Sequence, residues 1–246
     1  MARSKPYRED AVVVRTYDFG EADRIIVLLT KEHGVVRAVA KGVRRAKSRF
    51  GSRLAPFVHL NVQLYPGRSL ATITGADTVA FFATGIIDDY ERYTSGCAML
   101  EAAERLAQPA DTAMFDALLE ALGLLADARD PIAVLDSFLL QAMDFAGWAP
   151  VLFECAQCGR PGPHHAFHPG VGGACCHECR PSGSADINEE VLHYMWLLAG
   201  RYWEKAAEIA HAHPEYSSTA HRLVRTHLQW HMEQNVKALH IMEQSL

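Results

Sequence analysis

The first eighty residues alternate apolar and polar positions in short runs rich in β-branched residues, a pattern that predicts strands. Glycine-containing turns separate several of these runs, at Gly20, at His33-Gly34 and at Pro66-Gly67. Five short strands with such connections favour a small Greek-key barrel of the OB type. The predicted strands are Ala11–Tyr17, Arg24–Thr30, Val35–Ala40, Val58–Tyr65 and Leu70–Val79.

From about Ile86 the apolar positions recur with helical spacing, and alanine replaces the β-branched residues. Asp130-Pro131 marks a helix start, with a capping carboxylate followed by proline in the first turn, and Gly147 marks its end. The further helices are expected within Ala113–Ala126, Ile187–Ile209 and Tyr216–Met242.

These patterns predict an α+β multidomain protein, in which an N-terminal five-stranded OB-fold barrel precedes an all-α domain with an inserted four-cysteine zinc module. The expected divisions are 1–80 for the barrel, 81–150 and 183–246 for the two parts of the helical domain, and 151–182 for the zinc module.

The chain has 246 residues, of which 49% are hydrophobic, enough for two or three compact units. Its charged start, MARSKPYRED, lacks a signal-peptide pattern, and no later segment has the roughly 18 unbroken apolar residues of a membrane span. We therefore expect a soluble, cytoplasmic protein. In that reducing compartment the six cysteines are not expected to form disulfides, and because four of them lie in one short region, metal binding is the first expectation for these four.

Four of the cysteines form two CxxC pairs, Cys155 with Cys158 and Cys176 with Cys179, with 17 residues between the pairs. This spacing is typical of a zinc ribbon or knuckle, because each CxxC bends the chain so that two thiolates face one ion. A redox motif needs only one pair, and a catalytic zinc keeps an open position that four cysteines would close. We therefore predict one structural Zn²⁺ in preference to free thiols, a redox pair or a catalytic metal.

The neighbouring residues offer alternatives for one ligand. Cys175 lies beside Cys176, and four nearby histidines could replace a thiolate: His164, His165, His168 and His177. Cys176 is preferred because it completes the CxxC pair with Cys179. Cys175 and Cys97 are expected to be small buried hydrophobic residues.

The net charge of -5 is unevenly distributed. Residues 1–80 hold 14 Lys and Arg against 7 acidic residues, a net charge of +7, whereas the remaining 166 residues hold 10 against 22, a net charge of -12. A basic N-terminal part joined to an acidic remainder predicts separate roles, with a polyanion as the partner of the N-terminal part.

No acidic residue occurs in the 44 residues between Glu32 and Asp77, which hold eight cations. The densest part, 41–50, lacks an apolar period and is expected to be a mobile loop whose cations follow a phosphate backbone and release its counterions. The alternative is a solvated loop that only keeps the protein soluble. The eight cations are Arg37, Lys41, Arg44, Arg45, Lys47, Arg49, Arg53 and Arg68.

Three aromatic residues in this region are candidates for base stacking. Phe57 and Tyr65 flank a predicted strand and are expected to pack in the barrel core instead. Phe50 is therefore the preferred stacking residue.

Several motifs resemble the RecO family of bacterial recombination mediators. They are GEADRI at 20–25, KGVRRAKSRFGSRLAPF at 41–57, DYERY at 89–93, CAQCG at 155–159 and GGACCHEC at 172–179. The resemblance implies an N-terminal OB domain, a helical C-terminal domain and a zinc module inserted in the latter. Some family members lack the cysteines, which implies that zinc supports the fold rather than the activity.

The resemblance also implies a role in DNA repair through the RecF pathway. Members bind single- and double-stranded DNA, anneal complementary strands and work with RecR to load RecA on strands coated by single-stranded DNA-binding protein. A cytoplasmic, nucleoid-associated location follows from these partners. Carried over by position, the DNA-binding candidates are Arg24, Arg37, Lys41, Arg44, Arg45, Lys47, Arg49, Phe50 and Arg53.

Catalysis is not expected, because the sequence has no GxxxxGK[ST] loop, no HExxH and no GxSxG. The main alternative is an adaptor that docks repair proteins through its acidic helical domain, with only incidental DNA contact. A zinc-dependent nuclease is disfavoured, since no carboxylate or histidine constellation accompanies the cysteines.

Overall fold

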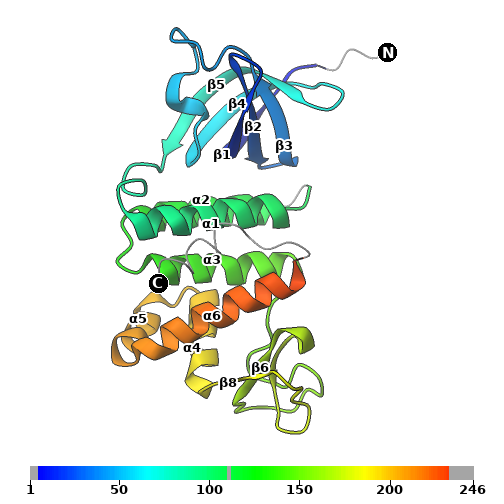
Figure 1. Cartoon of the computed structure of the whole chain (residues 1–246), viewed down its shortest axis with the longest axis vertical. Coiled ribbons are helices and arrows are strands. Elements are labelled where there is room, and N and C mark those ends of the chain that lie inside the picture. Colours follow the sequence, from blue (N-terminus) through cyan, green and yellow to red (C-terminus); the bar gives the residue numbers. More distant parts are fainter. Residues whose placement is uncertain (1–4, 110–111, 233–246) are drawn as a thin grey trace. The chain divides into compact units, whose positions relative to one another are not determined.

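The computed structural model describes residues 5–109 and 112–232. The chain divides into two compact units, residues 1–128 and 129–246. The first holds the strands drawn in blue and cyan in Figure 1 together with the first two helices, and the second holds the remaining helices and a small sheet.

Five strands of the first unit form a closed barrel in the order β1-β2-β3-β5-β4. All neighbouring pairs are antiparallel except β3 and β5, which run parallel. This is the OB-type barrel that the alternating pattern predicts. The strands are β1 (Tyr7–Phe19), β2 (Asp23–Thr30), β3 (Gly34–Ala40), β4 (Val58–Tyr65) and β5 (Ala71–Phe81).

The barrel closes around alternate side chains of its strands, as the period of two requires. Ala11 and Val13 of β1 and Ile26 and Leu28 of β2 are all 0% exposed and belong to one core cluster. All five predicted strands are present, each within three residues of its expected ends except the first, which begins four residues earlier.

The connection between β3 and β4 differs from the mobile loop that we predicted for 41–50. It is irregular, but it contains a short 3₁₀ helix, η1 (Gly51–Leu54), and it is anchored in the barrel core. Phe50 and Leu54 are buried there, and Val43 packs against the same cluster. The prediction missed this anchor because three apolar residues scattered over twelve positions among cations are too few to establish a period.

The first unit continues with helices α1 (Tyr90–Leu106) and α2 (Thr112–Ala126). The Asp89 side chain caps α1 by accepting a hydrogen bond from the Arg92 backbone N–H. Phe57, which is 2% exposed, lies so close to α1 that a Cβ added at Gly96 would come within 2.7 Å of its ring. A residue without a side chain is therefore required at position 96.

The second unit contains four α-helices in its described residues, and three of them bury several apolar residues each, whereas the helix Trp203–Ala212 buries only Ala206. Asp130 caps the first of them through the Ala133 backbone N–H, and Pro131 occupies its first turn, as predicted. The helices are α3 (Pro131–Phe145), α4 (Glu189–Ala199), α5 (Trp203–Ala212) and α6 (Pro214–His231).

Two helix predictions in this unit need comment. The prediction of a single helix over Ile187–Ile209 is wrong, because α4 ends at Ala199 with Gly200 as its cap. Arg201 then has a positive φ of 60°, which breaks the helical path before α5. The predicted final helix begins two residues earlier than expected, at Pro214, and it ends at His231, because Met232 has an extended backbone. The rest of the prediction, up to Met242, lies outside the described residues.

A cysteine-rich module lies between α3 and α4 and has a three-stranded sheet in the order β7-β6-β8. Its elements are β6 (Ala166–His168), the 3₁₀ helix η2 (Pro169–Val171), β7 (Gly173–Cys175) and β8 (Ala185–Asp186). No helix in the described ranges is long and apolar enough to cross a membrane.

Candidate metal centre and nucleic-acid interface

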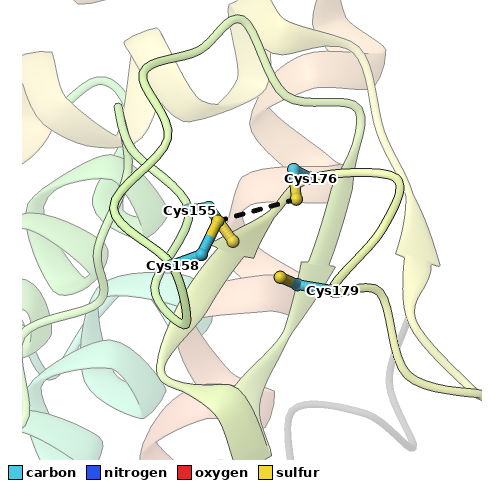
Figure 2. A group of neighbouring side chains, drawn as sticks. All are labelled: Cys155, Cys158, Cys176 and Cys179. Atoms are coloured by element: carbon cyan, nitrogen blue, oxygen red, sulfur yellow. Dashed lines mark hydrogen bonds between the residues drawn. The ribbon is translucent and has the colours of Figure 1, made fainter.

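The two CxxC pairs meet in the module. One sulfur atom from each of Cys155, Cys158, Cys176 and Cys179 lies within 4.8 Å of the other three. Figure 2 shows the four side chains converging from two separate turns of the chain, and the Sγ atoms of Cys158 and Cys176 are 3.9 Å apart. The structure thus brings together the four residues that the spacing singled out.

The backbone around the first pair forms a tight knuckle. The Cys155 N–H donates to the Arg160 carbonyl at 2.8 Å, and the Gly159 N–H donates to the Cys155 carbonyl at 2.8 Å. Gly159 has a positive φ of 71°, which suits glycine at this turn. These bonds hold the sulfurs of Cys155 and Cys158 on the same side of the turn.

The second pair is placed by the close approach of Gly173 to Val151. A Cβ at Gly173 would lie 2.3 Å from the Val151 carbonyl oxygen, so only glycine lets β7 run beside residue 151. The Val151 N–H donates to the Gly172 carbonyl and the Ala174 N–H donates to the Val151 carbonyl. The glycine pair therefore ties the second CxxC to the first.

Two of the four cysteines, Cys155 and Cys179, have pKa values shifted in opposite directions. Burial raises the pKa of Cys155, but hydrogen bonds from backbone N–H groups, first that of Cys176, outweigh burial and lower the pKa to about 6. Hydrogen bonds with the sulfurs of Cys176 and then Cys158 raise the pKa of Cys179 to about 12. Four soft donors with one readily formed thiolate fit a thiophilic metal ion such as zinc, which would complete the deprotonation.

The alternative ligands lie outside the four-sulfur group. Cys175 is buried, and its Sγ is 4.0 Å from the Ser184 Oγ. The His164 ring nitrogen Nε2 is engaged with the Arg160 carbonyl at 2.9 Å. Cys97 is half-buried on α1, where burial raises the pKa of its thiol, so this cysteine behaves as a packing residue.

A second candidate site lies at one end of the barrel, where strand register aligns several connections. One row of paired residues runs across all five strands: Tyr17, Ile25, Val39, Thr72 and Tyr65. The β1–β2 turn, the start of the β3–β4 connection and the β4–β5 turn therefore open at the same end of the barrel, as Figure 1 shows. We call this end, with segment 41–53, the basic end of the barrel.

Asp18 joins two cations at the basic end. It accepts a hydrogen bond from the Arg24 Nε at 2.8 Å, and its other oxygen lies 3.5 Å from an Arg44 guanidinium nitrogen. The hydrogen bond from Arg24, together with the charges of Arg44 and Arg24, lowers the pKa of Asp18. Within the described chain, Arg24 and Arg44 form no ion pair other than those with Asp18, so this one carboxylate holds both guanidinium groups near each other.

Four further cations at this end point into solvent. Lys41, Arg45, Lys47 and Arg49 are exposed, and none of them forms an ion pair within the described part of the chain. The remaining candidates are held more firmly. Arg37 pairs with Glu104 of α1 at 3.5 Å, and the Arg53 guanidinium donates to the Ala76 carbonyl at 3.4 Å.

The structure corrects the predictions for the aromatic residues. Phe50, the preferred stacking residue, is 3% exposed in the barrel core, so its ring is not available to bases, and Arg49 instead covers that ring at 4.8 Å. Phe57 is buried as expected, but it lies beside Gly96 of α1 and is not part of the barrel-core cluster. Tyr65, also expected in the barrel core, is 43% exposed at the end of β4.

Sequence reasoning missed two exposed aromatic residues at the basic end. Tyr17 and Phe19 are 43% and 48% exposed at the C-terminal end of β1. Their spacing of two places them on one face of the strand beside the β1–β2 turn. The signal that could have shown them was in the sequence, because two aromatic residues stand at alternate positions just before the turn at Gly20, where a strand end needs no apolar side chains.

A closed five-stranded barrel with a basic end, followed by helices that carry a four-cysteine module, defines the class of OB-barrel proteins with an added cysteine-rich unit. Residues 1–82 match the family model described as Recombination protein O N terminal, and residues 87–240 match the model described as Recombination protein O C terminal. The chain therefore belongs to the recombination protein O (RecO) family. Membership assigns it a mediator role in DNA recombination and repair, with DNA and repair proteins as partners.

Proposed function

We propose that this chain binds single- and double-stranded DNA through the basic end of its barrel. The observation that carries the proposal is the group of four exposed cations without acidic partners in the described chain, beside the Arg24 and Arg44 pair. Cations free of carboxylates can neutralise phosphates and release the counterions of the strand, which supplies sequence-independent affinity.

Binding of this kind explains strand annealing without covalent chemistry. Two single strands held by their phosphates on one cationic surface repel each other less, so that complementary bases can meet. We propose that the protein anneals strands in this way, is not an enzyme, and acts with RecR to load RecA on strands coated by single-stranded DNA-binding protein in the RecF pathway. Such a substrate places it at the nucleoid in the cytoplasm.

The proposed contacts follow the degree to which each cation is free. Phosphates would be contacted directly by the four cations without an acidic partner, Lys41, Arg45, Lys47 and Arg49. Further contacts would come from Arg24 and Arg44, the two arginines that share Asp18. Arg37 and Arg53 are proposed as peripheral contacts, since each already has a partner. Tyr65 takes the stacking role first assigned to Phe50.

We further propose that Cys155, Cys158, Cys176 and Cys179 hold one structural Zn²⁺. Four cysteines close the coordination sphere, so the ion would supply folding energy to the module and no open position for a reactant. The predicted divisions at 80/81, 150/151 and 182/183 are kept as the proposed functional boundaries.

Salt dependence tests the DNA-binding proposal. The affinity for a single-stranded oligonucleotide should fall linearly on a log-log plot, by about 0.7 per phosphate contact, as salt is raised. Four to six contacts would give a slope of roughly -3 to -4. A slope near zero would show that phosphate contacts do not drive binding.

The adaptor alternative rests on the acidic composition of the second half, which has a net charge of -12 after residue 80. It predicts that repair proteins are retained in a pull-down while measured DNA affinity is negligible at low salt. DNA affinity at low salt together with a steep slope would exclude it.

A further inference from the structure

A groove of about 490 Å³ lies in the second unit, between the first cysteine knuckle and α4. It belongs to neither the four-sulfur group nor the basic end of the barrel. One wall is formed by Phe153, Pro161 and Pro163, and the other by side chains of α4. Four of its apolar lining residues, Phe153, Pro161, Pro163 and Trp196, are exposed to solvent, which is unusual for a surface with no partner.

The α4 wall is a stripe of one helix face. Glu189, His193 and Trp196 follow the spacing of four and three that places side chains in a row. Trp196 is 40% exposed and its ring is held in place by two neighbours. It stacks on Tyr202 with ring centroids 5.1 Å apart, and it meets Phe153 edge to face at 5.9 Å.

The opposite wall is fixed by backbone hydrogen bonds of the knuckle. The Gly162 N–H donates to the Phe153 carbonyl at 2.8 Å, and Glu154 and Pro161 form an antiparallel bridge. The aromatic ring of Phe153 and the two prolines are therefore presented on a stiff loop. A pre-formed groove loses little conformational entropy when a ligand binds.

The charge of the groove selects its ligand. Glu189 and Glu190 are the charged residues among those that line it, and the lining includes no lysine or arginine. Glu190 has His193 as a neighbour at 3.4 Å, whereas Glu189 is exposed and forms no ion pair in the described ranges. Carboxylates at the rim repel phosphates and acidic peptides and attract a cation.

We propose that this groove binds an extended segment of a partner protein that carries arginine next to proline or another apolar residue. Aromatic-lined grooves accept extended proline-containing segments, and a guanidinium stacks favourably on an indole ring. The arginine would lie on Trp196 and reach the Glu189 carboxylate, while the apolar residue would pack against Phe153. This surface is separate from the proposed DNA contacts and does not depend on them.

Two synthetic hexapeptide amides test the proposal on the full-length, zinc-loaded protein: Pro-Leu-Arg-Pro-Leu-Arg and its counterpart with aspartate in place of arginine. Isothermal titration calorimetry should show that the basic peptide binds at least about tenfold more tightly than the acidic one. Trp196→Ala should weaken basic-peptide binding about tenfold. Trp230→Ala, which removes an exposed tryptophan outside the groove, is the matched control and should change it less than about twofold.

Glu189→Lys distinguishes charge recognition from non-specific apolar binding, because it reverses one exposed charge and leaves the apolar residues of the groove in place. It should reduce the preference for the basic peptide about tenfold or more. Binding of single-stranded DNA should stay unchanged in Trp196→Ala, which distinguishes this proposal from the DNA proposal. Equal or tighter binding of the acidic peptide, no detectable binding of the basic peptide, or equal weakening by Trp230→Ala would each overturn it.

Discussion

The four-cysteine module and the basic end of the barrel place their chemical groups in opposite ways. The module turns four sulfur atoms toward one point, within 4.8 Å of each other, where they can satisfy a single ion. The basic end turns its cations outward, whereas Phe50 of the same segment and the adjoining Leu54 are buried in the barrel core. Inward donors stabilise a local fold, whereas outward charges remain available to a partner.

This difference separates stability from activity. Removing an inward group exposes or empties part of a packed structure, so the free energy of unfolding falls. Removing an exposed cation changes stability little, because surface charges contribute at most a small amount, but it removes a phosphate contact. The two regions should therefore respond oppositely to mutation.

The largest effect is expected from loss of the metal. Cys158→Ser should abolish stable binding of one zinc ion per chain and increase amide hydrogen exchange in residues 151–182, because structural zinc contributes directly to folding. Affinity for single-stranded DNA should change less than about threefold, since the contacts lie elsewhere.

Cys175→Ser is the matched control, because Cys175 lies outside the four-sulfur group. Zinc content measured by elemental analysis should remain one per chain in this variant. Retention of zinc by Cys176→Ser together with its loss in Cys175→Ser would contradict the ligand assignment, though not the existence of a site.

The second effect concerns the anchor of the basic segment. Phe50→Ala should reduce the free energy of unfolding by about 3–5 kcal/mol, since it removes a buried aromatic side chain from the barrel core. Tyr65→Ala should leave thermal unfolding nearly unchanged and weaken single-stranded DNA binding by about 1–3 kcal/mol. Equal stability of the two variants would return Phe50 to the surface role first predicted for it.

A third effect should be confined to the second unit and to acid pH. Burial, with the neighbouring charge of His231, lowers the pKa of His227 to about 4, while its ring nitrogen Nε2 donates to the Trp148 carbonyl at 2.9 Å. A depressed histidine pKa means that the unfolded chain binds the proton first. The contribution of neutral His227 to the free energy of unfolding is therefore fully present above about pH 6.5. It is lost as the pH falls toward about 4, by up to about 3 kcal/mol.

Urea unfolding followed by tryptophan fluorescence at pH 7 and pH 4.5 measures this loss. His227→Gln retains a donor for the Trp148 carbonyl but does not titrate, so it should lose less stability than the wild type over this interval. The exposed His211→Gln serves as control and should behave like the wild type. Equal acid destabilisation of His227→Gln and the wild type would remove His227 as the cause.

The smallest effect is expected at Asp18. Asp18→Asn releases Arg24 and Arg44 from their shared carboxylate and removes one negative charge from the basic end. Single-stranded DNA should bind a few-fold more tightly at low salt, with a steeper salt slope. Unchanged affinity, measured by fluorescence anisotropy, would place these two arginines outside the DNA contact.

The sequence predicted the elements well because the strands and helices of this chain follow strong periods, and because the cysteine spacing is specific. It could not show that Phe50 is buried, since an isolated aromatic residue among cations has no period from which burial can be inferred. It also missed the break at Arg201, where a non-glycine residue adopts a positive φ. Nor could it show the ion-pair partners of two arginines. Arg37 pairs with Glu104, which is distant in sequence, and Arg24 pairs with Asp18 across a turn, and no local pattern reveals either contact.

The central claim is that DNA binding depends on exposed cations of the basic end and not on the metal site. It is tested most directly by single-stranded DNA affinity in Arg44→Ala/Arg45→Ala/Lys47→Ala, measured beside the melting temperature and beside Cys158→Ser. We expect the triple variant to bind at least about tenfold more weakly, with a salt slope smaller by about 2 and a nearly unchanged melting temperature. Full DNA affinity in the triple variant, or a loss of affinity in Cys158→Ser that equals it, would contradict the account.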